Sequence, residues 1–136
     1  MLFDTWGSLL TEPDYLCFSL PYLQQIITAL DPHPVIVFTK GQRLSLDSLT
    51  CRGLGIDWTT PLKYALEKTN KNKIIQGNFD PTMLLGNPQY FPEIVQQTLE
   101  HTDPDRLIIN LGHGILPQTP PDHVHAWLEA IMAYYA

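Results

Sequence analysis

Short apolar runs alternate with longer segments of helical periodicity along this chain. The strand-like runs lie at residues 1–4, Val35–Thr39, Leu54–Trp58, Lys73–Gly77 and Leu107–Asn110. Runs of four to eight apolar residues are typical of strands that are buried on both faces. Because strands that alternate with helices form βα units, we predict an α/β protein with a parallel sheet of five strands.

The predicted helices carry apolar residues at helical spacing. One begins at Ser19-Leu20-Pro21 and places Leu23, Ile26, Ile27 and Leu30 on one face, and another runs from Pro92 to about His101. The final segment carries apolar residues on one side, namely Val124, Trp127, Leu128, Ile131 and Tyr135. Such a face predicts a helix that covers the sheet. Three pairs, Thr60-Pro61, Asp80-Pro81 and Thr119-Pro120, place an oxygen-bearing side chain before a proline. We expect each pair to supply a helix N-cap and first residue.

Polar residues and glycines follow several predicted strands. They are Lys40-Gly41, Asp57, Gly77-Asn78 and Gly112-His113. Parallel α/β folds place their ligands where strands end. The segment Asn110–Gly114 is the most informative, because two glycines around one histidine allow a sharp turn and a close approach. We expect His113 to lie at the mouth of a pocket.

The number of predicted strands leaves two architectures open. An eight-stranded βα barrel needs about 250 residues, so 136 residues would supply only part of it. A small doubly wound sheet is the alternative. No predicted strand is followed by the fingerprint GxGxxG, so a dinucleotide-binding version of that fold gains no support.

Composition and charge narrow the partners. The chain suits a single domain over residues 1–136, with 44% hydrophobic and 16% charged residues. The net charge of −6 argues against nucleic acid or an anionic membrane as the main partner. Cys17 and Cys51 are isolated, and neither a signal peptide nor a membrane span is evident. We expect a cytoplasmic protein without a metal site.

Six separated segments together resemble the uroporphyrinogen decarboxylase family, in the family's order. They are Phe3–Gly7, Phe18–Tyr22, Phe38–Gly41, Gly55–Thr59, Gln76–Pro81 and Asn110–Ile115. The resemblance covers essentially the whole chain but only the C-terminal part of the family's (β/α)8 barrel. It implies a partial TIM-type barrel with about strands four to eight and their helices.

This resemblance implies the conversion of uroporphyrinogen III to coproporphyrinogen III with release of four CO2, without metal, cofactor or covalent intermediate. Thr5 and His113 match positions that the family uses to bind substrate. The family's arginine-rich segment and its pyrrole-binding aspartate lie upstream of these residues, so no catalytic residue is assigned to this chain. We therefore expect it to be inactive alone and to work with a complementing N-terminal half or as a homo-oligomer.

Two other residues at strand ends have open roles. Asp57 fits either a carboxylate base or a buried side chain that holds loop N–H groups. Lys40 is the best remaining cation near the mouth of the predicted pocket. Two alternative functions also stay open: a corrinoid-linked methyltransferase, which needs His and Cys zinc ligands, and a non-catalytic remnant or assembly element whose open sheet edges favour association.

Overall fold

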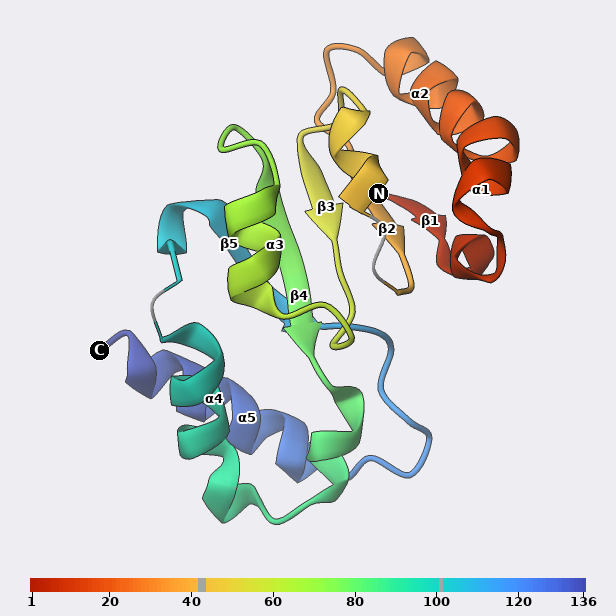
Figure 1. Cartoon of the computed structure of the whole chain (residues 1–136). Coiled ribbons are helices and arrows are strands. Elements are labelled where there is room, and N and C mark those ends of the chain that lie inside the picture. Colours follow the sequence, from red (N-terminus) through yellow and green to blue (C-terminus); the bar gives the residue numbers. More distant parts are fainter. Residues whose placement is uncertain (42–43, 101) are drawn as a thin grey trace.

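The computed structural model describes residues 1–41, 44–100 and 102–136. Within them, five strands form one sheet in the order in which they occur along the chain, and every neighbouring pair is parallel. The strands are β1 (Leu2–Asp4), β2 (Ile36–Thr39), β3 (Gly53–Gly55), β4 (Ile74–Phe79) and β5 (Leu107–Leu111). This arrangement confirms the predicted α/β class with five parallel strands (Figure 1).

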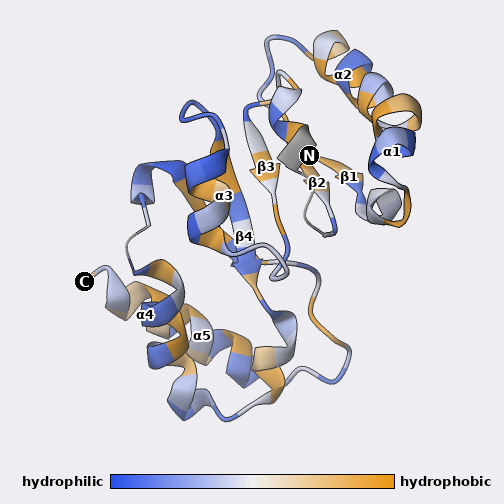
Figure 2. Cartoon of the chain, in the orientation of Figure 1, coloured by the Kyte–Doolittle hydropathy of each residue, from blue (hydrophilic) through white to orange (hydrophobic). Residues whose placement is uncertain are grey.

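Helices connect the strands. The α-helices are α1 (Glu12–Phe18), α2 (Leu20–Ala29), α3 (Leu62–Lys68), α4 (Phe91–Leu99) and α5 (Pro121–Tyr134). Short 3-10 helices are η1 (Thr5–Leu9), η2 (Leu44–Ser48), η3 (Pro81–Leu85), η4 (Pro88–Tyr90) and η5 (Pro104–Arg106). Helices α1 and α2 lie beside β1 and β2, whereas α4 and α5 pack together near the far end of β4 (Figure 1). Hydrophobic and hydrophilic residues alternate around α3 and α4 (Figure 2), as expected of helices with one buried face.

One face of the sheet supplies the hydrophobic core. Strand register aligns a row of five apolar side chains across it, namely Leu2, Val37, Leu54, Ile75 and Leu107. The three central members are almost completely buried, and all five contact or belong to the core cluster with side chains from α2, α3, α4 and α5. Burial of these side chains therefore fixes which face of each strand meets the helices.

The opposite face of the sheet is open in the described part of the chain. Its aligned row is Phe3, Phe38, Gly55, Gln76 and Ile108. Phe3 is 71% exposed, and Ile108 on the last strand is also exposed. A parallel sheet with helices on one face and the exposed side chains of Phe3 and Ile108 on the other has the layering of a barrel segment, in which the second face points to the interior.

Strand boundaries differ from the prediction around Asp57. Strand β3 ends at Gly55 instead of Trp58, because the chain turns away there and Asp57 becomes completely buried. Strand β4 continues to Phe79, two residues beyond its predicted end. Gly77 has φ +138°, and a Cβ atom at this position would lie 2.4 Å from the Ile56 carbonyl oxygen, so only glycine fits this crossing.

The predicted helix caps are partly wrong. Asp80 caps η3 as expected, since its Oδ1 accepts a 2.8 Å hydrogen bond from Thr82 N. Helices α3 and α5 instead begin one residue later than predicted, after Pro61 and Pro120. Thr60 belongs to the preceding loop because its carbonyl accepts from Asn78 Nδ2 at 2.6 Å. Thr119 belongs to a turn, where its N–H donates to Leu116 O at 2.9 Å.

The helical apolar patterns are also only partly buried. In α2, Leu23 and Ile27 enter the core, whereas Ile26 and Leu30 remain exposed. Helix α1, which Thr11 caps, has no counterpart in the prediction. The helix predicted from Pro92 begins at Phe91 and ends at Leu99, and His101 lies outside the described residues.

Candidate functional site

A hollow of about 380 Å³ lies on the open face of the sheet, towards the carboxyl ends of the strands. Thr5 and His113, which come from opposite ends of the chain, both line it. The other lining residues are Met1, Phe3, Phe38, Gly55, Ile56, Gln76, Asn110, Leu111, Gly112 and Gly114. The fold thus brings together the two predicted substrate-binding residues on one largely apolar surface.

Thr5 is held in place by its neighbour Asp4. The Asp4 carbonyl accepts a 2.8 Å hydrogen bond from Thr39 Oγ1, which joins the ends of β1 and β2. The Asp4 carboxylate accepts a 2.5 Å hydrogen bond from Ser19 Oγ, at the start of α2. Thr5 then begins η1, with its side chain half-buried at the hollow. Its hydroxyl can donate to a ligand oxygen and accept from a ligand donor.

His113 follows β5 and is exposed to the hollow. Its imidazole centroid lies 6.0 Å from the Phe38 ring in an edge arrangement, and Phe38 in turn lies 6.1 Å from the Phe3 ring. Either nitrogen of an imidazole can donate a hydrogen bond to a carboxylate, depending on its protonation. The site therefore combines two polar donors with an aromatic surface.

The two glycines beside His113 have different roles. A Cβ atom at Gly112 would lie 2.8 Å from Asp57 Cα and 2.9 Å from Trp58 N, so the close approach is to the protein's own backbone. Gly112 N also donates to Phe79 O at 2.7 Å. Nothing lies within 4 Å of a Cβ atom added to Gly114.

The sequence leaves two roles open for Asp57, a carboxylate base or a buried side chain that holds loop N–H groups, and the structure shows the second. It is 0% exposed, and its carboxylate accepts hydrogen bonds from Gly41 N at 2.8 Å and Thr59 N at 3.0 Å. Thr59 Oγ1 donates to the same carboxylate at 2.5 Å. Asp57 does not line the hollow, so it holds loops and does not face a ligand there.

Positive charge is scarce at this site. Lys40 Nζ lies 5.7 Å from the centroid of the Trp58 ring, a cation–π distance, and Lys40 does not line the hollow. Arg106 is engaged by backbone carbonyls near the amino end of β4, and Arg52 donates to Asn72 O at 3.3 Å. Arg43 lies outside the described residues.

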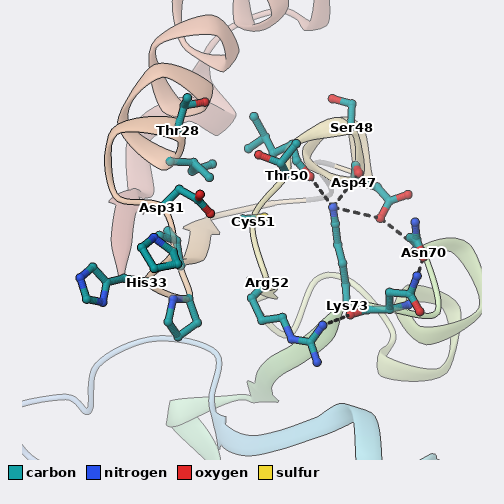
Figure 3. Close-up of a pocket in the computed structure, with 16 residues that line it drawn as sticks. Thr28, Asp31, His33, Asp47, Ser48, Thr50, Cys51, Arg52, Asn70 and Lys73 are labelled. Atoms are coloured by element: carbon teal, nitrogen blue, oxygen red, sulfur yellow. Dashed lines mark hydrogen bonds and ion pairs between the residues drawn. The ribbon is translucent and has the colours of Figure 1, made fainter.

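A larger hollow, of about 870 Å³, lies at the opposite end of the sheet, around the residues that precede β2, β3 and β4 (Figure 3). Its buried cation, Lys73, donates to the carbonyl oxygens of Asp47 at 2.8 Å and Leu49 at 2.5 Å, and Nζ lies 3.8 Å from Asp47 Oδ1 (Figure 3). Lys73 is therefore committed to the fold. In βα barrels the amino ends of the strands carry stability and the carboxyl ends carry chemistry.

Sequence reasoning missed the aromatic part of the site. Phe3 and Phe38 line the hollow, and their signal was their alternation with the core-facing residues of the same strands. Trp6, which follows Thr5, is 73% exposed. His123, near the start of α5, has Nδ1 2.7 Å from the Leu84 carbonyl oxygen and its ring against Phe91.

The described residues contain no group of three or more His, Cys, Asp or Glu side chains placed to hold a metal ion. Cys51 is buried before β3, at the amino end of the sheet, and Cys17 lies exposed on α1. Neither thiol shares the hollow with His113. Among the same residues, no helix is long and apolar enough to cross a membrane.

The fold is that of a βα barrel segment, with a hollow at the carboxyl ends of its strands. Residues 1–134 match the family model for uroporphyrinogen decarboxylase. The chain is 43% identical to the uroporphyrinogen decarboxylase of Dichelobacter nodosus, over 96% of its length and 39% of the relative's. It is 38% identical to that of Francisella tularensis subsp. novicida, over 100% of its length and 42% of the relative's. The chain therefore belongs to the uroporphyrinogen decarboxylase family.

The chain spans about two fifths of the length of these relatives. Among solved structures, a methyltransferase from Methanosarcina mazei superposes with a TM-score of 0.81 at 22% identity, over 98% of this chain and 41% of that protein. This likeness shows a shared fold. In both comparisons the chain corresponds to part of a longer protein.

Proposed function

We propose that this chain supplies a substrate-binding part of a uroporphyrinogen decarboxylase, which converts uroporphyrinogen III to coproporphyrinogen III with release of four CO2. The observation that carries the proposal is the meeting of Thr5 and His113 in one hollow at the carboxyl ends of the strands. Family membership supports it, since the curated relatives carry that name.

The hollow suits a tetrapyrrole chemically. The exposed rings of Phe3 and His113, both packed against the buried Phe38, offer a surface against which a puckered, partly apolar macrocycle can pack. Thr5 and His113 offer donors for its carboxylates. In the reaction that the family implies, a pyrrole ring gains a proton, the C–C bond to an acetate carboxylate breaks, and its electron pair enters that ring as CO2 leaves. A second proton then adds to the side-chain carbon, and the ring releases the first. The role of this chain is to bind and orient that ring system.

A complementing chain is part of the proposal. Uroporphyrinogen carries eight carboxylates, and the described residues that line the hollow include no lysine or arginine. We therefore propose that cations and the proton-handling carboxylate come from a chain that carries further barrel strands. The two isolated free cysteines support a reducing, cytoplasmic location.

The test is a reconstituted decarboxylation assay. The chain is mixed with the part of the Dichelobacter nodosus relative that it does not cover, and coproporphyrinogen is measured. We expect activity in the mixture above that of either part, and a loss of at least about tenfold with Thr5→Ala or His113→Ala, since each removes a hydrogen bond to a charged group. His125→Ala, which loses only an exposed contact with Glu129, is the matched control and should keep full activity. An unchanged rate with His113→Ala would refute the assigned role.

A further inference from the structure

Asp57 contacts residues at the carboxyl ends of four of the five strands. Its carboxylate accepts hydrogen bonds from Gly41 N after β2 and from Thr59 N in the loop that follows β3. Its carbonyl oxygen lies 3.4 Å from the donating Asn78 Nδ2 at the end of β4. The backbone of Gly112, after β5, packs directly on its Cα atom. One buried residue thus joins the carboxyl ends of β2, β3, β4 and β5.

The contact with Gly112 fixes the backbone of His113 from one side. Because a Cβ atom at Gly112 would approach Asp57 Cα to 2.8 Å, the chain before His113 has no room to move towards the Asp57 loop. The 2.7 Å hydrogen bond from Gly112 N to Phe79 O holds it in the other direction, against the end of β4. The position of His113 therefore depends on where the Asp57 loop lies.

The hydrogen bond from Gly41 ties Asp57 to the strand whose aromatic ring packs against His113. Gly41 lies just beyond β2, and Phe38 in that strand is the ring against which His113 packs at 6.0 Å. Asp57 itself does not line the hollow and is 0% exposed, so it touches no ligand there. Its influence on the site can pass only through the groups that it holds.

We infer that Asp57 is a positioning residue, which sets the direction in which the His113 ring meets the ligand. This inference rests on the proposed function, in which His113 binds a carboxylate of the tetrapyrrole. The Asp57 carboxylate keeps the loops after β2 and β3 together, and its backbone sets the path of the loop after β5.

Two variants perturb this arrangement from opposite sides. Asp57→Asn keeps the side-chain volume but turns one acceptor oxygen into an NH2 donor, which would face either Gly41 N–H or Thr59 N–H. Gly112→Ala leaves the Asp57 carboxylate chemically unchanged and instead forces the backbones of Gly112 and Asp57 apart. The controls are Gly114→Ala, which meets open space beside the same histidine, and Asp80→Ala, which removes a helix cap elsewhere.

The first readout is the NMR resonance of the His113 Cε1–Hε1 group in the ligand-free full chain. Both Asp57→Asn and Gly112→Ala should shift it, because the ring moves relative to Phe38, whereas both controls should leave it in place. If Asp57→Asn does not fold, Gly112→Ala still decides the matter. An unchanged His113 resonance in Gly112→Ala overturns the inference.

The second readout is a fluorescence titration with uroporphyrin, the oxidised octacarboxylate. Asp57→Asn and His113→Ala should each weaken binding about tenfold, and the double variant should bind no more weakly than His113→Ala alone. Additive losses in the double variant would overturn the inference. If His113→Ala binds normally, the proposed function fails, while the resonance measurement still tests the positioning role.

Discussion

At the scale of single residues, Arg106 illustrates how a scarce cation serves the fold instead of the ligand. Its guanidinium donates to the carbonyl oxygens of Lys73, Leu66 and Asn70 and to Thr69 Oγ1. Only a planar fork of five N–H groups can serve acceptors spread over the end of α3 and the start of β4. We predict that Arg106→Lys lowers the free energy of unfolding by about 2 kcal/mol, measured by urea denaturation.

Arg52→Lys is the matched control, since within the described residues the Arg52 guanidinium makes one hydrogen bond, to Asn72 O at 3.3 Å. The free energy of unfolding that Arg52→Lys loses should be well under half of that lost by Arg106→Lys. Equal losses in the two variants would show that the several hydrogen bonds of the Arg106 guanidinium stabilise the fold no more than the single one of Arg52.

Cys51 gives the stability a dependence on pH. Burial raises the pKa of its thiol above the ordinary value of 9.0, with Lys73 opposing this shift. The unfolded chain therefore loses this proton at a lower pH than the folded chain does. The contribution is complete below about pH 9 and is lost as pH rises through the folded pKa. Between roughly pH 8 and pH 10, the free energy of unfolding should fall more for the natural chain than for Cys51→Ala. Parallel curves would contradict this.

At the scale of elements, one aromatic contact joins α5 to the sheet. Trp127 is buried, and its ring centroid lies 5.5 Å from that of Phe79 at the end of β4. Trp127→Ala should cost about 3–5 kcal/mol of unfolding free energy, because it leaves a cavity between α5 and β4. Its neighbour Leu128 is exposed, so Leu128→Ala should change stability by no more than about 0.5 kcal/mol. A loss below about 1 kcal/mol for Trp127→Ala would show that α5 does not depend on this contact.

The elements were predictable where local patterns decide them. Apolar runs located all five strands, and the Asp80-Pro81 pair located η3, because both signals depend on neighbouring residues. The end of β3 and the starts of α3 and α5 were not predictable. They depend on contacts between distant residues, such as the hydrogen bond from Asn78 Nδ2 to the Thr60 carbonyl.

The same distinction holds for the candidate site. His113 and Thr5 were found from motif and resemblance, and the fold places both at one hollow. The aromatic surface of Phe3 and Phe38 requires the strand register, which no single run of residues contains. The need for glycine at position 112 was not predictable from local sequence either, because the backbone that excludes a side chain there belongs to residues 57 and 58.

At the scale of the whole molecule, the outer strands β1 and β5 each have a hydrogen-bonded neighbour on one side only within the described sheet. Unpaired strand edges with exposed apolar residues favour association. We predict oligomers whose size rises with concentration, measured by light scattering. Ile108→Lys on β5 should reduce association more than Ile26→Lys, which places the same charge on exposed helix α2. A monodisperse monomer that melts cooperatively would contradict this.

The central claim is that Thr5 and His113 form a tetrapyrrole-binding surface, and calorimetric titration of the full chain with uroporphyrin tests it most directly. We predict saturable uroporphyrin binding at one site per chain, weakened at least about tenfold by His113→Ala and unchanged by His125→Ala. No saturable binding, or equal affinity in the natural chain and His113→Ala, would contradict it.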